Sequence, residues 1–97
     1  MQQRGPTRVL IVDDHPVWAD GLRTALSAES GIEVVGVASN GQEALTLTSK
    51  LQPAVVLLDA RLRGQSGPET ARLLRSQFPS IHVLALSAHD DEETVFE

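Results

Sequence analysis

The sequence contains no cysteine and a single lysine, Lys50, among its 97 residues. Without cysteine there is no disulfide framework, no thiolate zinc site and no cysteine nucleophile, which agrees with a reducing cytosol. The shortage of lysine and the net charge of −5 argue against a nucleic-acid-binding surface in this segment, because affinity for phosphate backbones comes from clustered Lys and Arg. These absences exclude thiol chemistry and disfavour direct contact with DNA.

Long apolar runs are also missing. The longest, at residues 9–12 and 54–58, are far shorter than the roughly 20 residues of a membrane helix. Residues 1–6 lack the apolar core of a signal peptide. We therefore expect a polar leader at 1–6, one domain at 7–97, a cytoplasmic location and no membrane contact. Hydrophobic residues make up 41% of the sequence, which is enough to form one hydrophobic core.

Short β-branched apolar runs alternate with helical patterns along the chain. The runs at 9–12, 33–37, 55–58 and 81–86 are typical of strands buried on both faces of a parallel sheet. Helices are predicted to begin near Pro16, after Asn40 and after Ser66, with a fourth from Asp90. Their expected inward-facing residues are Trp18, Leu22, Ala25 and Leu26 in the first helix, Ala44, Leu47, Thr48 and Leu51 in the second, and Ala71, Leu74 and Phe78 in the third.

This alternation of strands and helices predicts the fold class. Strand–helix–strand units are right-handed and build a parallel sheet covered by helices on both faces. We expect an α/β, flavodoxin-like, doubly wound parallel sheet with strand order 2-1-3-4. In such sheets ligands bind outside the carboxyl ends of the strands, so the residues that follow each strand are the candidates for function.

Carboxylates follow two strands that are neighbours in this order. Asp13 and Asp14 end the first strand, and Asp59 ends the third. Each alone could be a helix cap, but gathered in one pocket they repel one another unless a cation or a shared proton compensates. Oxygen ligands suit Mg²⁺, and a carboxylate can accept a phosphoryl group. Ser87, after the fourth strand, is either a donor to a phosphoryl oxygen or a solvated turn serine.

Three segments together carry a family resemblance. Residues 8–16 (Arg-Val-Leu-Ile-Val-Asp-Asp-His-Pro), 55–59 (Val-Val-Leu-Leu-Asp) and 84–87 (Leu-Ala-Leu-Ser) resemble the receiver domain of bacterial two-component response regulators. The Asp-Asp-His-Pro start is most similar to the subfamily with a LuxR-type helix-turn-helix output. The resemblance extends from Thr7 to the C-terminus.

The resemblance implies a phosphorylation-dependent signalling switch rather than an enzyme. Asp59 would accept a phosphoryl group from a sensor histidine kinase, and Ser87 would be the switch hydroxyl. Mg²⁺ would be held by Asp13, Asp14, Asp59 and the main-chain carbonyl of Arg61. DNA would be reached only through an output domain outside this chain, and the resemblance is compatible with a homodimer.

The chain departs from the family pattern in two regions. Leu62 and Arg63 stand where the family usually has Met-Pro. The fifth strand with its lysine, the aromatic switch residue and the last helix are not found, so the domain is expected to be truncated before the fifth strand. Lys50 lies in the second predicted helix and cannot replace that lysine. The fourth strand is therefore expected to keep an unpaired edge.

Two other functions remain open at this stage. One is a phosphate-independent interaction or dimerisation module. The other is a Mg²⁺-dependent phosphatase with Asp59 as nucleophile, which is disfavoured because Arg61 occupies the position of its usual acid. His15 either tunes the metal site or, as we prefer, starts the first helix, and Trp18 is interpreted as a packing residue. His82 and His89 have no spacing that would join them to the carboxylates.

Overall fold

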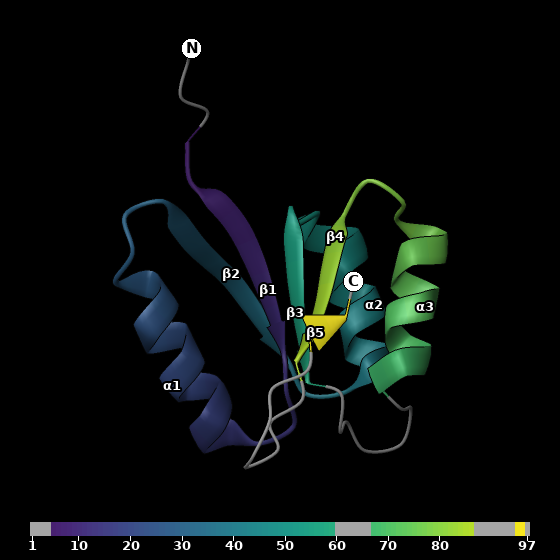
Figure 1. The fold of residues 1–97 in the computed structure, drawn as a ribbon, viewed down its shortest axis with the longest axis horizontal. Coiled ribbons are helices and arrows are strands. Elements are labelled where there is room, and N and C mark those ends of the chain that lie inside the picture. The colour runs from purple at the N-terminus through teal and green to yellow at the C-terminus, as the bar shows by residue number, and fades with distance from the viewer. Residues whose placement is uncertain (1–4, 60–66, 87–94, 97) are drawn as a thin grey trace.

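A computed structural model describes residues 5–59, 67–86 and, by their backbone, 95–96. Strands and helices alternate as predicted (Figure 1). The elements are β1 (Thr7–Val12), α1 (Pro16–Ser27), β2 (Ile32–Ala38), α2 (Gly41–Leu51), β3 (Val55–Asp59), α3 (Gly67–Gln77), β4 (His82–Leu86) and β5 (Val95–Phe96). None of the helices in this described part has the length and apolar character needed to cross a bilayer.

The sheet has the order β2-β1-β3-β4-β5. Its first four strands are parallel, which confirms the predicted 2-1-3-4 order. Figure 1 shows α1 on one face of this sheet and α2 and α3 on the other. The connection from β1 to β2 runs through α1 and the connection from β2 to β3 runs through α2 on the opposite face, so the switch point of the doubly wound fold lies between the ends of β1 and β3.

The short strand β5 corrects two expectations. It pairs antiparallel with β4, with Ala85 opposite Phe96 and Leu86 opposite Val95, so β4 does not keep an unpaired edge at its carboxyl end. The predicted helix from Asp90 also does not reach the end of the chain, and its first residues lie outside the described ranges. An exposed strand edge offers unsatisfied N–H and C=O groups, which explains why extended pairing replaces helix at Val95 and Phe96.

The core lies between the sheet and the pair α2 and α3. The predicted inward residues of both helices are confirmed, because Ala44, Thr48, Ala71 and Leu74 are buried, while Leu47, Leu51 and Phe78 pack against the core. The sheet contributes Leu10, Val12, Ala38, Val56, Leu58, Val83 and Ala85. This apolar layer supports the strands whose carboxyl ends form the site.

The predicted inward stripe of α1 is wrong in two of its four positions. Trp18 is 56% exposed and Ala25 is exposed, whereas Leu22 and Leu26 are half-buried. The buried residue of α1 is Ala19. The inward-facing stripe therefore consists of Ala19, Leu22 and Leu26, and begins one residue later than predicted. A helix that packs on a sheet with one side buries a narrow stripe, and the larger Trp18 falls at its margin.

Both ends of α2 are capped. The side chain of Asn40 accepts a hydrogen bond of 2.8 Å from the Glu43 N–H, which confirms the predicted N-cap. At the other end Gln52 has a left-handed conformation with φ of 52°. The guanidinium of Arg8, in β1, donates to the carbonyls of Leu51 at 2.6 Å and Gln52 at 3.0 Å. Arg8 therefore ties the C-terminus of α2 to the sheet.

Candidate functional site

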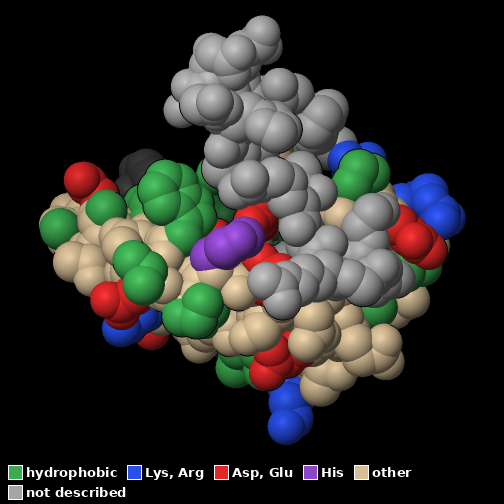
Figure 2. Space-filling model, turned by 90° about the horizontal axis from the view of Figure 1, so that it is seen from below, with side chains coloured by type: hydrophobic (Ala, Val, Ile, Leu, Met, Phe, Trp, Pro, Cys, Tyr) green, Lys and Arg blue, Asp and Glu red, His purple; other side chains and the backbone are tan. Residues whose placement is uncertain are grey.

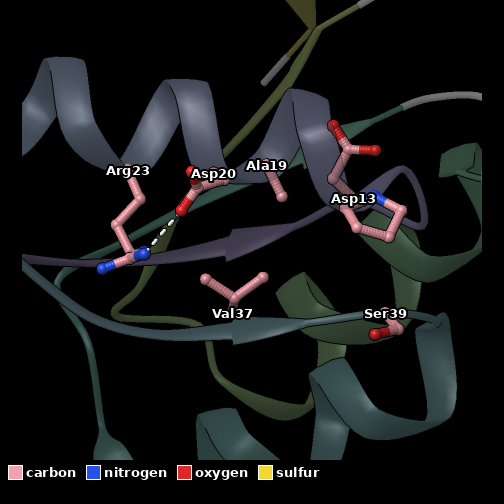
Figure 3. Close-up of a pocket in the computed structure, with 7 residues that line it drawn as sticks. Asp13, Ala19, Asp20, Arg23, Val37 and Ser39 are labelled. Atoms are coloured by element: carbon pink, nitrogen blue, oxygen red, sulfur yellow. Dashed lines mark hydrogen bonds and ion pairs between the residues drawn. The ribbon is translucent and has the colours of Figure 1, made fainter.

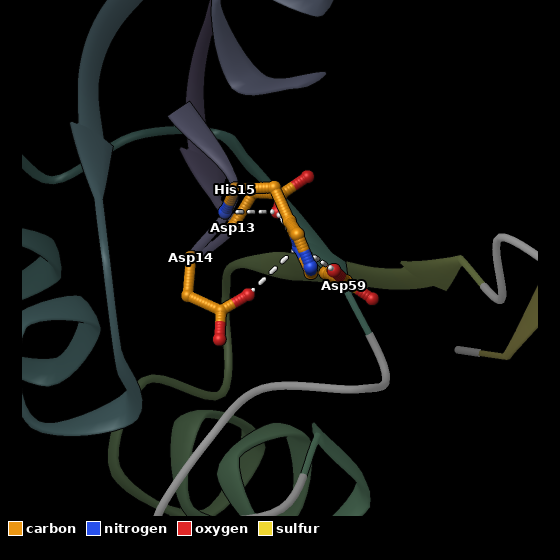
Figure 4. Close-up of side chains that lie close together, drawn as sticks. All are labelled: Asp13, Asp14, His15 and Asp59. Atoms are coloured by element: carbon orange, nitrogen blue, oxygen red, sulfur yellow. Dashed lines mark hydrogen bonds and ion pairs between the residues drawn. The ribbon is translucent and has the colours of Figure 1, made fainter. Parts of the chain in front are cut away.

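Three carboxylates meet where β1 and β3 end. Asp13 follows β1, and its N–H donates to the Ala38 carbonyl at 2.9 Å, which extends the β1–β2 pairing by one residue. Asp59 is the last residue of β3. Asp13 and Asp59 are 4% and 6% exposed, and Asp14 is half-buried. Because the strands are adjacent and parallel, the sequence prediction that these three residues come together is confirmed (Figure 4).

The turn between β1 and α1 is fixed by a local hydrogen bond. Asp13 Oδ1 accepts from the backbone N–H of His15 at 2.9 Å, the pattern of an Asx turn. Pro16 then opens α1, and its restricted φ suits the first helical position. This short turn holds Asp14 and His15 beside the end of β3.

The side chain of His15 faces the carboxylates and does not cap α1. His15 occupies the N-cap position of α1 but makes no side-chain capping hydrogen bond. Its Nδ1 atom instead lies 3.2 Å from Asp13 Oδ1, 2.9 Å from Asp14 Oδ1 and 3.7 Å from Asp59 Oδ2. Figure 4 shows the ring pointing toward all three carboxylates. The preferred interpretation of His15 as a helix-start residue is therefore incomplete, and a role at the carboxylates is favoured.

Electrostatics at the site favour a cation. Burial raises the pKa of Asp13 and the negative charge of Asp59 adds to this, while hydrogen bonds from His15 partly offset it. A raised pKa means that ionised Asp13 is unfavourable in the pocket without compensation. A bound divalent cation supplies that compensation directly.

The donor set fits a small divalent cation. One candidate ligand atom from each of Asp13, Asp14, His15 and Asp59 lies within 4.8 Å of the others. For metal–ligand bonds of about 2.1 Å, adjacent octahedral ligands are about 3.0 Å apart and opposite ones about 4.2 Å. The predicted ligand carbonyl of Arg61 and the predicted switch hydroxyl of Ser87 lie outside the described residues.

His15 brings the site to the molecular surface, since its side chain is 48% exposed while Asp13 and Asp59 are buried. Figure 2 views the molecule toward the carboxyl ends of the strands and shows a histidine and carboxylates meeting there, with hydrophobic side chains beside them. A cavity of about 240 Å³ lies next to the site between α1 and β2 (Figure 3). It is lined by Asp13, Pro16, Ala19, Asp20, Arg23, Val37 and Ser39. Sequence analysis did not find this cavity, because its lining comes from two elements with no shared motif.

Comparison with known proteins places the chain in a family. The model of the response regulator receiver domain matches residues 9–97. The transcriptional regulatory protein MctR of Rhizobium johnstonii is 37% identical over 98% of this chain and 44% of its own length. The nitrate/nitrite response regulator NarL of Escherichia coli K12 is 36% identical with the same coverage.

A solved structure agrees with these relatives. The receiver domain of the putative response regulator NarL from Mycobacterium tuberculosis has a TM-score of 0.83 at 40% identity, covering 91% of this chain and 71% of that one. The chain spans less than half the length of the curated relatives it matches. The match over 9–97, the strand order and the three carboxylates agree, and the chain belongs to the response regulator receiver domain family.

Proposed function

We propose that residues 7–97, after a leader at 1–6, form a phosphorylation-dependent switch whose phosphoacceptor is Asp59. The observation that carries this proposal is the position of Asp59 at the end of β3, with Asp13, Asp14 and His15 contributing ligand-type atoms within 4.8 Å. One strand end thus combines a nucleophilic carboxylate with groups able to bind a cation.

The proposed reaction moves one phosphoryl group. An oxygen of the Asp59 carboxylate attacks phosphorus, a P–O bond forms, and the P–N bond of a phosphohistidine breaks with the imidazole leaving. Asp13, Asp14 and Asp59 would hold Mg²⁺, with the Arg61 carbonyl as a further ligand, and the ion would supply positive charge next to the phosphoryl oxygens. The Ser87 hydroxyl donates to a phosphoryl oxygen after transfer.

The names of the relatives support the proposed partners. MctR is named as a transcriptional regulator and NarL as a response regulator, which supports a sensor histidine kinase upstream and control of transcription downstream. Because this chain covers 44% of each, DNA would be contacted by an output domain outside these residues. We propose a cytoplasmic switch, compatible with a homodimer, that changes partner binding and has no catalytic turnover.

Intact mass spectrometry tests the proposal. The protein is incubated with Mg²⁺ and a small phosphodonor, in parallel with Asp59→Asn and with Asp20→Asn, an exposed α1 carboxylate. One added phosphoryl group is expected in the wild type and in Asp20→Asn, and none in Asp59→Asn. No gain in a folded wild-type sample would refute phosphorylation here and favour the phosphate-independent interaction module. Continuous release of phosphate, many turnovers per chain, would favour the phosphatase.

A further inference from the structure

His15 places a nitrogen donor among the three carboxylates. We propose that His15 Nδ1 is a direct ligand of the cation bound at this site, and that this nitrogen shifts the metal preference from Mg²⁺ toward first-row transition ions that bind imidazole, such as Co²⁺. The inference rests on the proposed function, since it concerns the cation of the same site. It adds a ligand and a specificity that the three carboxylates alone do not provide.

The distances match shared coordination. His15 Nδ1 is 2.9 Å from Asp14 Oδ1 and 3.2 Å from Asp13 Oδ1, close to the spacing of about 3.0 Å between adjacent octahedral ligands. Its distance of 3.7 Å to Asp59 Oδ2 lies between the adjacent and opposite spacings. The nitrogen therefore lies where a cation held by the carboxylates can contact it, and the four candidate atoms, spread over 4.8 Å, need to draw together by only a few tenths of an ångström to share one ion.

The orientation of the ring is not explained by the helix. A capping residue uses its side chain to accept from the first helical N–H groups, and His15 makes no such hydrogen bond. Its backbone N–H is already engaged with Asp13 Oδ1, which fixes the start of the side chain near the site. The side chain is 48% exposed, so the nitrogen can exchange a carboxylate partner for a metal ion at little structural cost.

Ligand chemistry gives the direction of the selectivity. Mg²⁺ is a hard ion that prefers oxygen ligands and keeps several waters. Imidazole is a better ligand for later first-row ions, and affinity rises along the Irving–Williams order. Replacing one oxygen or water by His15 Nδ1 should therefore strengthen Co²⁺ binding more than Mg²⁺ binding.

The test measures metal binding directly, apart from phosphorylation. Co²⁺ and Mg²⁺ are titrated separately by calorimetry into the wild type, His15→Gln and His82→Gln. The last variant is a control, because His82 is an exposed histidine at the end of β4 that lies away from the site. Proton NMR of the Co²⁺-bound wild type should show hyperfine-shifted imidazole resonances that disappear in His15→Gln and remain in His82→Gln. Loss of even outer-shell partners costs about 10–100-fold in affinity, so His15→Gln should weaken Co²⁺ by at least about tenfold and lower the Co²⁺/Mg²⁺ affinity ratio.

Each outcome decides the inference. Co²⁺ binding without shifted imidazole resonances, or an unchanged affinity ratio in His15→Gln, would overturn it while leaving phosphorylation of Asp59 intact. Loss of the resonances only in His82→Gln would place the ion elsewhere and overturn it too. If the folded wild type binds neither ion, both the inference and the proposed metal site fail, and the mass measurement with Asp59→Asn shows separately whether phosphoryl transfer survives.

Discussion

Replacing Asp13 by asparagine should stabilise the metal-free protein. Asp13 is almost fully buried, and candidate oxygens of Asp13, Asp14 and Asp59 lie within 4.8 Å of one another. Two like charges at that separation repel by about 1 kcal/mol in water and by about 3 kcal/mol at an effective dielectric constant of about 20. Asparagine keeps an oxygen that can accept from the His15 N–H, so the turn is preserved while the charge is removed. We expect an increase of about 1–3 kcal/mol in the free energy of unfolding.

The pH dependence of this effect has a defined sign. Burial and the negative charge of Asp59 raise the pKa of Asp13 above its ordinary value of 3.8 in the folded state. The folded protein therefore binds a proton more tightly than the unfolded chain, so the wild type loses stability as pH rises from the unfolded pKa through the folded one. The advantage of Asp13→Asn should be full at neutral pH and should vanish below about pH 3.8.

Urea unfolding followed by circular dichroism measures both effects. Curves are recorded in EDTA for the wild type, Asp13→Asn and the control Asp20→Asn, whose exposed ion pair with Arg23 should contribute no more than about 1 kcal/mol. Mg²⁺ at about 100 times its dissociation constant should add about 2.7 kcal/mol to the wild type and much less to Asp13→Asn. The reasoning would be refuted if metal-free Asp13→Asn were less stable than the metal-free wild type. It would also be refuted if Mg²⁺ stabilised both proteins equally.

Three further predictions concern stability alone and are measured by the same unfolding curves. Arg8→Met keeps the apolar stem but removes the donor to the last carbonyls of α2, and should cost about 1.5–3 kcal/mol; no loss would mean that water replaces the guanidinium. Gln52→Gly removes the backbone strain of the left-handed residue after α2 and should raise the free energy of unfolding by up to about 1 kcal/mol. A lower free energy of unfolding would show that contacts of the Gln52 side chain outweigh this strain. Asn40→Ala removes the N-cap of α2 and should cost about 1 kcal/mol, with Asn40→Asp retaining most of the stability if capping is the cause.

The sequence predicted the strand ends because they depend on local patterns. An apolar β-branched run that stops at a carboxylate marks both the end of β1, just before Asp13, and the end of β3, at Asp59. Parallel alignment then brings these residues together regardless of side-chain detail. The N-cap of α2 was predictable for the same reason, since Asn40 and Glu43 interact within one turn.

Other features depend on contacts that no local pattern encodes. The ring of His15 is oriented by three carboxylates, one of which is distant in the chain. The exposure of Trp18 depends on which side of α1 meets the sheet. A register shift between Val9 and Leu10 pairs Leu10 with Gly36, where an added Cβ would lie 3.0 Å from the Leu51 Cδ1 atom. Each of these required the positions of neighbouring elements in space.

The exposed position of Trp18 gives the protein an intrinsic optical reporter. It is the only tryptophan in the sequence, so its emission comes from one partly hydrated indole in the first turn of α1, three residues after His15. A rearrangement of the β1–α1 turn changes the hydration of that indole and therefore its emission wavelength. Titrating a cation into the unlabelled protein therefore tests, through this single side chain, whether occupancy of the carboxylate site rearranges the turn.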